Sequence, residues 1–442
     1  MAAKGLIRDI CRGVGRDNIA LRCAVFSLGH LSPNPKNVMF VGMMPIALKF
    51  SSASRYDSTR GLPSGSGPEL GLTMAILCVQ SLIDMKLGAF RRGLASVKQA
   101  GEVIAANQTA FCSSGPHRDV MQFWFSINAW YSMQCPPWNV HARVLPAATL
   151  KASWGILRST PEKGHEIAAL LCESRRLYAR LSLFRLIESG GIASEDLANW
   201  PLSFQEIVNA GGPAPEEEYS MSALAALRDG LDGWHNSVGM NDRPVYAKTA
   251  ELKAQLDSEP PGVRFESLWF QSYDAAMCYD QYAAAHALCS QHSLDVLTGK
   301  AARDESYTDE WIHLILQIVP GLRWDYDERN YLGLMWIVGQ VVALRCTDPH
   351  IIAWIQKKAS LLEDITPDWS CVLPKNLFGP LLAMQKDLLA QGQAAMHLFT
   401  EDAREVNTAR QVLRVGLDLT TRKGFVDLLP ENSMVAIANG TT

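Results

Sequence analysis

Apolar residues recur along most of the chain with the spacing of amphipathic helices. Residues 72–83 follow an i, i+3, i+4, i+7 pattern, and residues 89–106 repeat it with basic residues on the outer face. Period-2 runs rich in Val, Ile and Thr are nearly absent, so we expect no sheet. The pattern predicts an all-α protein, built as a large helical bundle or barrel. Its helices are expected at residues 72–83, 89–106, 117–133, 166–187, 222–234, 265–290, 310–318, 325–344, 349–362 and 380–399.

Turn-forming residues mark the breaks between these segments. The longest weakly patterned stretch, residues 188–218, is rich in Gly and Pro. We expect a single all-helical domain over residues 1–442, with a loop or lid at 189–220. The polar tail at 430–442 is expected to be frayed.

Composition narrows the class of protein. Of 442 residues, 48% are hydrophobic and 19% are charged, which excludes a disordered acidic chain. The net charge of −4 argues against nucleic-acid binding. The longest apolar stretch, residues 331–344, is shorter than the roughly 18 residues that a membrane span needs. Ten cysteines without a C-x-x-C pair and an N-terminus without an apolar core predict a soluble, cytoplasmic protein.

Acids and aromatic side chains mix on the helix expected at 265–290. At about 100° per residue, Glu266, Asp274 and Asp280 fall within a sector of about 120°. Carboxylates among apolar residues are costly unless they have a partner, so a structural partner or a metal ion would each explain them. The aromatic residues at the start of this segment include Trp269, Phe270 and Tyr273.

A second mixed segment begins at Trp324. Asp325, Glu328 and Arg329 share one face of the helix expected there. An ordinary ion pair between Asp325 and Arg329, or acids that favour a helix N-terminus, would explain this face without any function.

A third segment, residues 123–132, is rich in aromatic residues that include Trp130. It places Asn128 and Ser132 one helical turn apart. Polar residues at this spacing also occur in helices that have no binding function, so both interpretations stay open.

Together these residues suit the ionisation of a diphosphate. Mg²⁺ prefers oxygen ligands and commonly uses one or two carboxylates together with substrate phosphates. Arginines such as Arg228 and Arg329 would neutralise the leaving diphosphate. Aromatic rings would stabilise the resulting carbocation by roughly 0.5–2 kcal/mol each. The 12 tryptophans of the chain, of which several lie near these acids, agree with that chemistry.

Two segments resemble the helical middle region of fungal zinc-cluster transcription factors. They are residues 87–94, with the sequence LGAFRRGL, and residues 331–340, with the sequence YLGLMWIVGQ. The six-cysteine zinc cluster of that family cannot be built from cysteines as far apart as these. The resemblance therefore implies a helical regulatory body without its DNA-binding module.

The length, the N-terminus and the acid–aromatic helices together resemble divergent fungal class I sesquiterpene cyclases. That family makes humulene in tropolone-sesquiterpenoid pathways. The usual D-D-x-x-D and N-x-x-x-S-x-x-x-E motifs are absent: Asn128 and Ser132 match two positions of the second, and Pro136 stands at its acid. Asp274 matches only the first position of the N-x-x-x-S-x-x-x-E motif, and Cys278 and Tyr282 stand at its other two positions.

This resemblance implies Mg²⁺-dependent cyclisation of farnesyl diphosphate, an isoprenyl diphosphate, inside an enclosed pocket. The alternatives are a non-enzymatic, transcription-factor-like regulatory protein and a carrier of an apolar ligand; a homodimer is left open. The expected pocket residues are Trp130, Trp269, Phe270, Tyr273 and Trp324, the expected diphosphate ligands are Arg228 and Arg329, and the expected metal ligands are Asp274, Asp280, Asp325, Glu328, Asn128 and Ser132.

Overall fold

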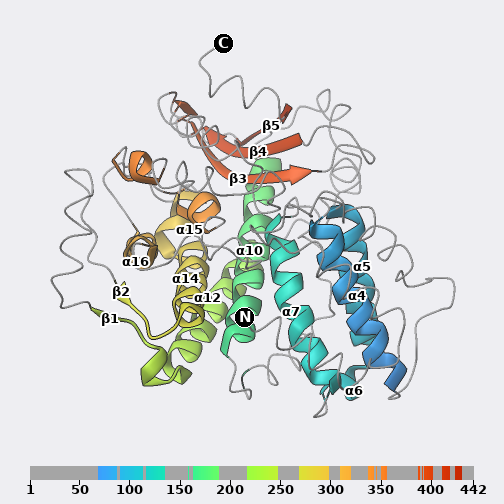
Figure 1. The fold of residues 1–442 in the computed structure, drawn as a ribbon. Coiled ribbons are helices and arrows are strands. Elements are labelled where there is room, and N and C mark those ends of the chain that lie inside the picture. Colours follow the sequence, from blue (N-terminus) through green and yellow to red (C-terminus); the bar gives the residue numbers. More distant parts are fainter. Residues whose placement is uncertain are drawn as a thin grey trace, which may run out of the picture. The chain divides into compact units, whose positions relative to one another are not determined.

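Helices make up most of the described part of the chain in a computed structural model (Figure 1). The structure describes residues 68–86, 90–112, 116–134, 158, 163–188, 217–246, 268–297, 309–319, 337–342, 345, 350–355, 387–388, 391, 393–401, 411–418 and 424–430. The chain divides into two compact units, one of residues 1–131 with 143–169 and one of residues 132–142 with 170–442. Two such units occur within single domains as well as in two-domain chains, so the expected single domain stays a prediction.

The first unit contains a helical hairpin. The described helices of this unit include α4 (Pro68–Lys86), α5 (Phe90–Ala106), α6 (Gln108–Cys112) and most of α7 (Pro116–Gln134), and α4 and α5 form the hairpin. Helices α4 and α5 pack along one another, and an ion pair of 3.2 Å joins Asp84 to Arg92. In the core of this unit, the indole Nε1 of Trp124 donates to the carbonyl oxygen of Val97 at 3.0 Å.

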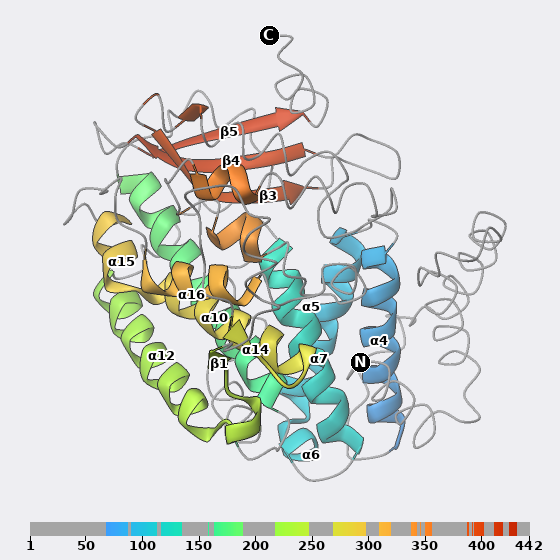
Figure 2. The same ribbon diagram turned by 60° about the vertical axis from the view of Figure 1, so that its left-hand side comes forward.

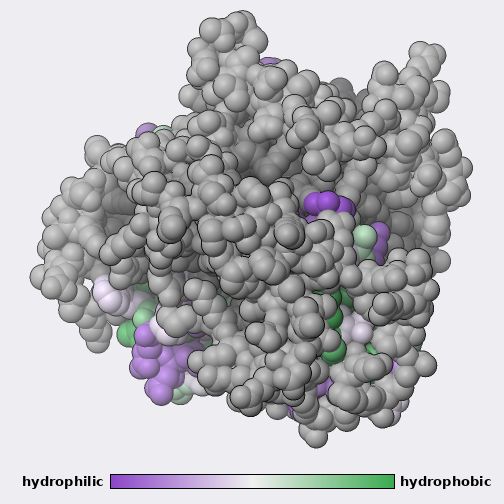
Figure 3. All heavy atoms as spheres, turned by 45° about the vertical axis from the view of Figure 1, so that its right-hand side comes forward, coloured by the Kyte–Doolittle hydropathy of each residue, from purple (hydrophilic) through white to green (hydrophobic). Residues whose placement is uncertain are grey.

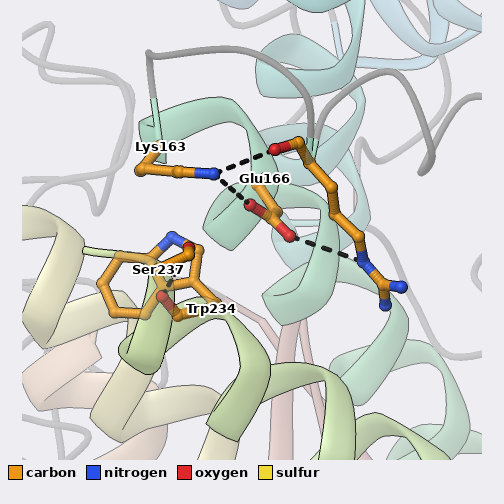
Figure 4. A network of polar contacts seen from close by, with 5 residues as sticks. Lys163, Glu166, Trp234 and Ser237 are labelled. Carbon is orange, nitrogen blue, oxygen red and sulfur yellow. Dashed lines mark hydrogen bonds and ion pairs between the residues drawn. The ribbon is translucent and has the colours of Figure 1, made fainter.

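Helix α10 (Lys163–Glu188) starts in the first unit and continues into the second. The carboxylate of Glu166 in its first turn accepts from Lys163 Nζ at 3.5 Å and lies 3.6 Å from Arg158 Nε (Figure 4). Because backbone N–H groups at a helix N-terminus are unsatisfied, an acid in this turn is favourable.

The second unit is built around α14 (Tyr273–Cys289). Helices α12 (Glu217–Ser237), α15 (Gln291–Leu297) and α16 (Glu310–Ile318) and the π-helical turn η5 (Val338–Val342) pack against α14 (Figure 2). Four alanines of α14, Ala283, Ala284, Ala285 and Ala287, are fully buried. Side chains this small allow the neighbouring elements to approach the α14 backbone closely.

Two sheets complete the second unit. A ribbon joins β1 (Val245–Tyr246) to β2 (Leu268–Trp269), following the short helix η3 (Met240–Asp242). Strands β3 (Gln393–Glu401), β4 (Gln411–Asp418) and β5 (Gly424–Pro430) form an antiparallel sheet with β4 in the centre (Figure 1). The prediction of a predominantly helical protein is confirmed, whereas the expectation of no sheet is wrong.

Two of the predicted helices, at residues 265–290 and 380–399, differ from the structure, the first for a local reason and the second for a non-local one. The helix expected from residue 265 starts at Tyr273, because Ser272 is extended and its hydroxyl accepts from the backbone N–H of Ala275, as an N-cap does. The helix expected at 380–399 is wrong over 393–399, where the chain pairs with β4. Its Ala- and Gln-rich sequence favours a helix locally, and pairing with a strand distant in sequence prevails.

The other predicted helices agree with the structure where it describes them. Helix α16 has the predicted bounds, and α4, α5, α7, α10 and α12 differ from the predictions only near their ends. The lid at 189–220 is described only from residue 217, and the tail is described only at residue 430. The lid and the frayed tail therefore stay predictions.

Candidate functional site

Seven rings gather where α12, α14 and α16 meet in the second unit, and we name them the aromatic cluster. Helix α14 contributes Tyr279, Tyr282 and His286, whose i, i+3, i+7 spacing places them on one face of the helix. The neighbouring elements supply the other members, which are Trp234 and His235 of α12, Phe270 after β2, and Trp311 of α16.

The rings of the cluster contact one another directly. Trp234 stacks on Tyr282 with centroids 5.3 Å apart, and Tyr282 meets His286 edge-on at 4.6 Å. His286 in turn lies parallel to Trp311, with centroids 3.9 Å apart and an interplanar angle of 10°. Such pairs contribute about 0.5–1.5 kcal/mol each beyond their burial, so the cluster ties the three helices together.

A hydrogen bond links the two polar groups at one side of the cluster. The hydroxyl of Tyr279 lies 3.2 Å from Nδ1 of His235, and the histidine tautomer decides which group donates. Burial and the nearby Arg243 lower the pKa of His235, although Asp232 opposes them. Burial also raises the pKa of Tyr279, so both groups are neutral near pH 7.

His286 is a further buried polar residue of the cluster. Its side chain is only 5% exposed, and its Nε2 lies 3.6 Å from Oδ1 of Asp232, a side chain that is 64% exposed. Burial lowers the pKa of His286 to about 4, with further contributions from Arg228 and His235. The imidazole is therefore neutral at pH 7.

Two arginines border the cluster. Arg228 Nη1 donates to Oε1 of Gln291 at 3.5 Å. The guanidinium of Arg243 donates to the backbone carbonyls of His235, Asn236 and Val238 at the end of α12. In the same last turn, the Ser237 hydroxyl donates to the Trp234 carbonyl at 2.8 Å (Figure 4). Basic groups and donors at this end of a helix satisfy its free carbonyls.

The predicted metal ligands of α14 lie in different environments. Asp274 is exposed in the first turn, whereas Asp280 is completely buried. The structure therefore does not bring these two carboxylates to one surface, and Glu266 lies outside the described residues. Among the described residues, no three His, Cys, Asp or Glu side chains lie together as metal ligands would.

The predicted aromatic residues near β2 differ in exposure and contacts. Trp269 is 50% exposed, and Phe270 contacts the Tyr279 ring at 5.4 Å. Tyr273 is the first residue of α14 and is partly exposed. Only Phe270 of these three belongs to the aromatic cluster.

The other predicted residues lie on α7 or outside the described residues. Asn128 lies partly buried in α7 of the first unit, while the side chains of Trp130 and Ser132 in the same helix are not described. Trp324, Asp325, Glu328 and Arg329 lie outside the described residues. Their assignment to a pocket, a metal ion or a diphosphate stays a prediction.

Two buried arginines of α10 lie in the second unit. Arg176 makes a two-pronged ion pair with Glu173, at 2.7 and 2.6 Å. Burial, together with the nearby Arg345, lowers the pKa of Arg175 to about 9. The guanidinium of Arg345 lies over the Tyr178 ring, 4.7 Å from its centroid. Neither the ion pair nor the stacked guanidinium was predicted from the sequence.

Surface features in the described part are mixed. Met240 and Val245 are the most exposed large hydrophobic residues, and both lie close in sequence to the charged Asp242 and Arg243. Among the described residues visible in Figure 3, both hydrophilic and hydrophobic ones reach the surface. No described helix is long and apolar enough to cross a membrane.

Sequence reasoning missed most of the aromatic cluster. The residues predicted on this segment were its acids together with Trp269, Phe270 and Tyr273, although it also carries Tyr279, Tyr282 and His286 at helical spacing. That spacing was a usable signal, but the partners on α12 and α16 are distant in sequence. The chain matches no protein-family model, no curated protein and no solved structure.

Proposed function

We propose that the protein is a Mg²⁺-dependent cyclase that ionises farnesyl diphosphate and releases a medium-ring sesquiterpene such as humulene. The observation that carries the proposal is the aromatic cluster, set within a predominantly helical body and bordered by Arg228. A carbocation needs surroundings that are dry and rich in aromatic faces, and buried rings provide both.

Two kinds of residue would act on the substrate. Arg228 and Arg329 would neutralise the diphosphate as its bond to carbon breaks, because guanidinium groups bind phosphate oxygens in two-pronged geometry. Aromatic faces would stabilise the allylic cation, each by about 0.5–2 kcal/mol. Phe270 and the predicted Trp269, Tyr273 and Trp324 of the second unit are the candidates for that role.

The metal site requires residues from beyond the described part. Asp274 is a suitable magnesium ligand because it is exposed and close to solvent, but one carboxylate does not make a site. The proposal therefore requires Asp325 or Glu328 to lie beside Asp274. Asp280, which is completely buried, would need a route to solvent before it could bind a hydrated ion.

The test uses purified protein with farnesyl diphosphate and Mg²⁺, followed by analysis of the released hydrocarbons. We expect a cyclic hydrocarbon that is absent from a boiled control and lost with EDTA. Asp274→Ala should lower turnover at least about 100-fold, equal to about 2.7 kcal/mol. Asp229→Ala, which changes an exposed acid on α12, serves as the matched control and should leave turnover unchanged. Absence of product, or product that EDTA does not reduce, would refute the proposal.

A second candidate is a regulatory protein that acts through protein partners. The direct ring-to-ring contacts of Trp234, Tyr279 and Tyr282 favour it, because rings that fill space among themselves act as a core. Under this candidate the protein makes no hydrocarbon, and changes within the cluster alter stability alone.

A further inference from the structure

The contact between α14 and α16 includes a titratable ring. His286 lies flat on Trp311, 3.9 Å between centroids, and this stack joins the middle of the second unit to α16. Tyr282 adds an edge contact to the same Trp311 ring at 5.6 Å. The buried residues of α16 include the aliphatic Ile312, Ile315 and Leu316, which carry no charge.

We propose that His286 is an acid-sensitive latch, whose ring holds Trp311 and α16 in place when neutral and loosens them when it gains a proton from solvent. Protonation converts the imidazole into a cation at a position that is almost completely buried. A charge in such a position must be hydrated or paired, and opening of α16 exposes the ring to water.

The groups around His286 decide whether the cation is tolerated in the closed state. Helix α12 presents Asp232, which attracts the cation, and Arg228 and His235, which disfavour it. On α16, Glu310 is exposed in the first turn. The face of Trp311 offers the protonated His286 a cation–π contact. Tyr282 of α14 itself is neutral because burial raises its pKa.

The attractive groups do not compensate for burial. Asp232 is 64% exposed, so water screens its charge, and its 3.6 Å separation from Nε2 is too long for a good hydrogen bond. The pKa of His286 in the closed state accordingly lies near 4, below the ordinary value of 6.5. Because the open state binds the proton more readily, the closed state is lost progressively as the pH falls below about 6.5.

Hydrogen exchange of the full-length protein, followed by mass spectrometry, tests the latch. Exchange of the α16 amides, corrected for the intrinsic effect of pH, should show an opening constant about 30-fold larger at pH 5 than at pH 7.5. His286→Phe keeps a ring on Trp311 without the titration, so its opening constant should change less than about 3-fold. His313→Phe, which removes an exposed histidine of α16 itself, should respond to pH as the wild type does.

An equal response of His286→Phe and the wild type to pH would overturn the proposal. Should His286→Phe fail to fold, exchange of the imidazole Cε1 hydrogen in the wild-type chain reports the pKa of each histidine. A His286 pKa near 4 to 5, together with the pH-dependent opening of α16, supports the latch. Titration of His286 near 6.5, or opening that does not change with pH, refutes it.

Discussion

Replacement of Trp234 by alanine tests whether the aromatic cluster holds the second unit together. The side chain is 1% exposed, and its ring stacks on Tyr282 and meets Tyr279 edge-on, at 5.3 and 5.4 Å. A buried tryptophan removes about 200 Å² from water, worth about 5 kcal/mol at 25 cal/mol per Å². Measured costs of Trp→Ala in protein cores are about 3–5 kcal/mol, because a cavity is left behind. We therefore expect Trp234→Ala to lower the free energy of unfolding by about 3–5 kcal/mol.

The matched control is Trp269→Ala in the same unit. Both variants lose one indole, but Trp269 is 50% exposed and lies at the edge of the β1–β2 ribbon. The smaller buried area, about half that of Trp234, predicts a loss of at most about 2.5 kcal/mol. Urea unfolding followed by far-UV circular dichroism, with linear extrapolation to water, measures both losses.

The difference between the losses of unfolding free energy in the two variants tests the prediction. Equal losses would mean that neither the deeper burial of Trp234 nor its ring contacts adds to the stability of the second unit. A loss below about 1.5 kcal/mol for Trp234→Ala would refute the cluster as the core of this unit. Because the chain has two units, a variant that shifts only one of two unfolding transitions assigns that transition to the second unit.

Three further changes test contacts elsewhere. Glu173→Gln should cost about 3–5 kcal/mol of unfolding free energy, since it leaves Arg176 as a buried cation without its two-pronged partner; a loss below 1 kcal/mol, on the order of a surface pair, would contradict this. Ser272→Ala should lower the thermal midpoint through loss of the α14 N-cap, worth about 1 kcal/mol, whereas Ser272→Asp should retain it. Trp124→Phe should cost about 1–3 kcal/mol in urea unfolding, because it removes the indole donor to a buried carbonyl of α5; no measurable change would mean that this hydrogen bond does not form.

Helix positions were largely predictable because helical periodicity is a local property. The bounds of α16 follow from the apolar spacing in residues 310–318 and from Asp309, whose side chain accepts from the N–H of Trp311. The start of α14 was predictable in principle from Ser272, but the aromatic residues before it extended the apparent pattern. Strand β3 was not predictable, because only its pairing with β4 turns an Ala-rich segment into a strand.

The candidate site shows the same division. The sequence drew attention to residues 265–290 through their acids and through Trp269, Phe270 and Tyr273, whereas the helical spacing of Tyr279, Tyr282 and His286 in the same segment was visible but unused. It could not reveal that Asp274 is exposed and Asp280 buried, because burial depends on which elements pack against α14.

By itself, the sequence determined where most helices lie and that acids and aromatic residues share them. The tertiary structure decided which side chains meet. Trp234 of α12 stacks on Tyr282, and His286 of α14 stacks on Trp311 of α16, only after α12 and α16 have packed on α14. The physical reason is that helix formation depends on residues three and four apart, whereas ring stacking, burial and pKa shifts depend on neighbours that are distant in sequence.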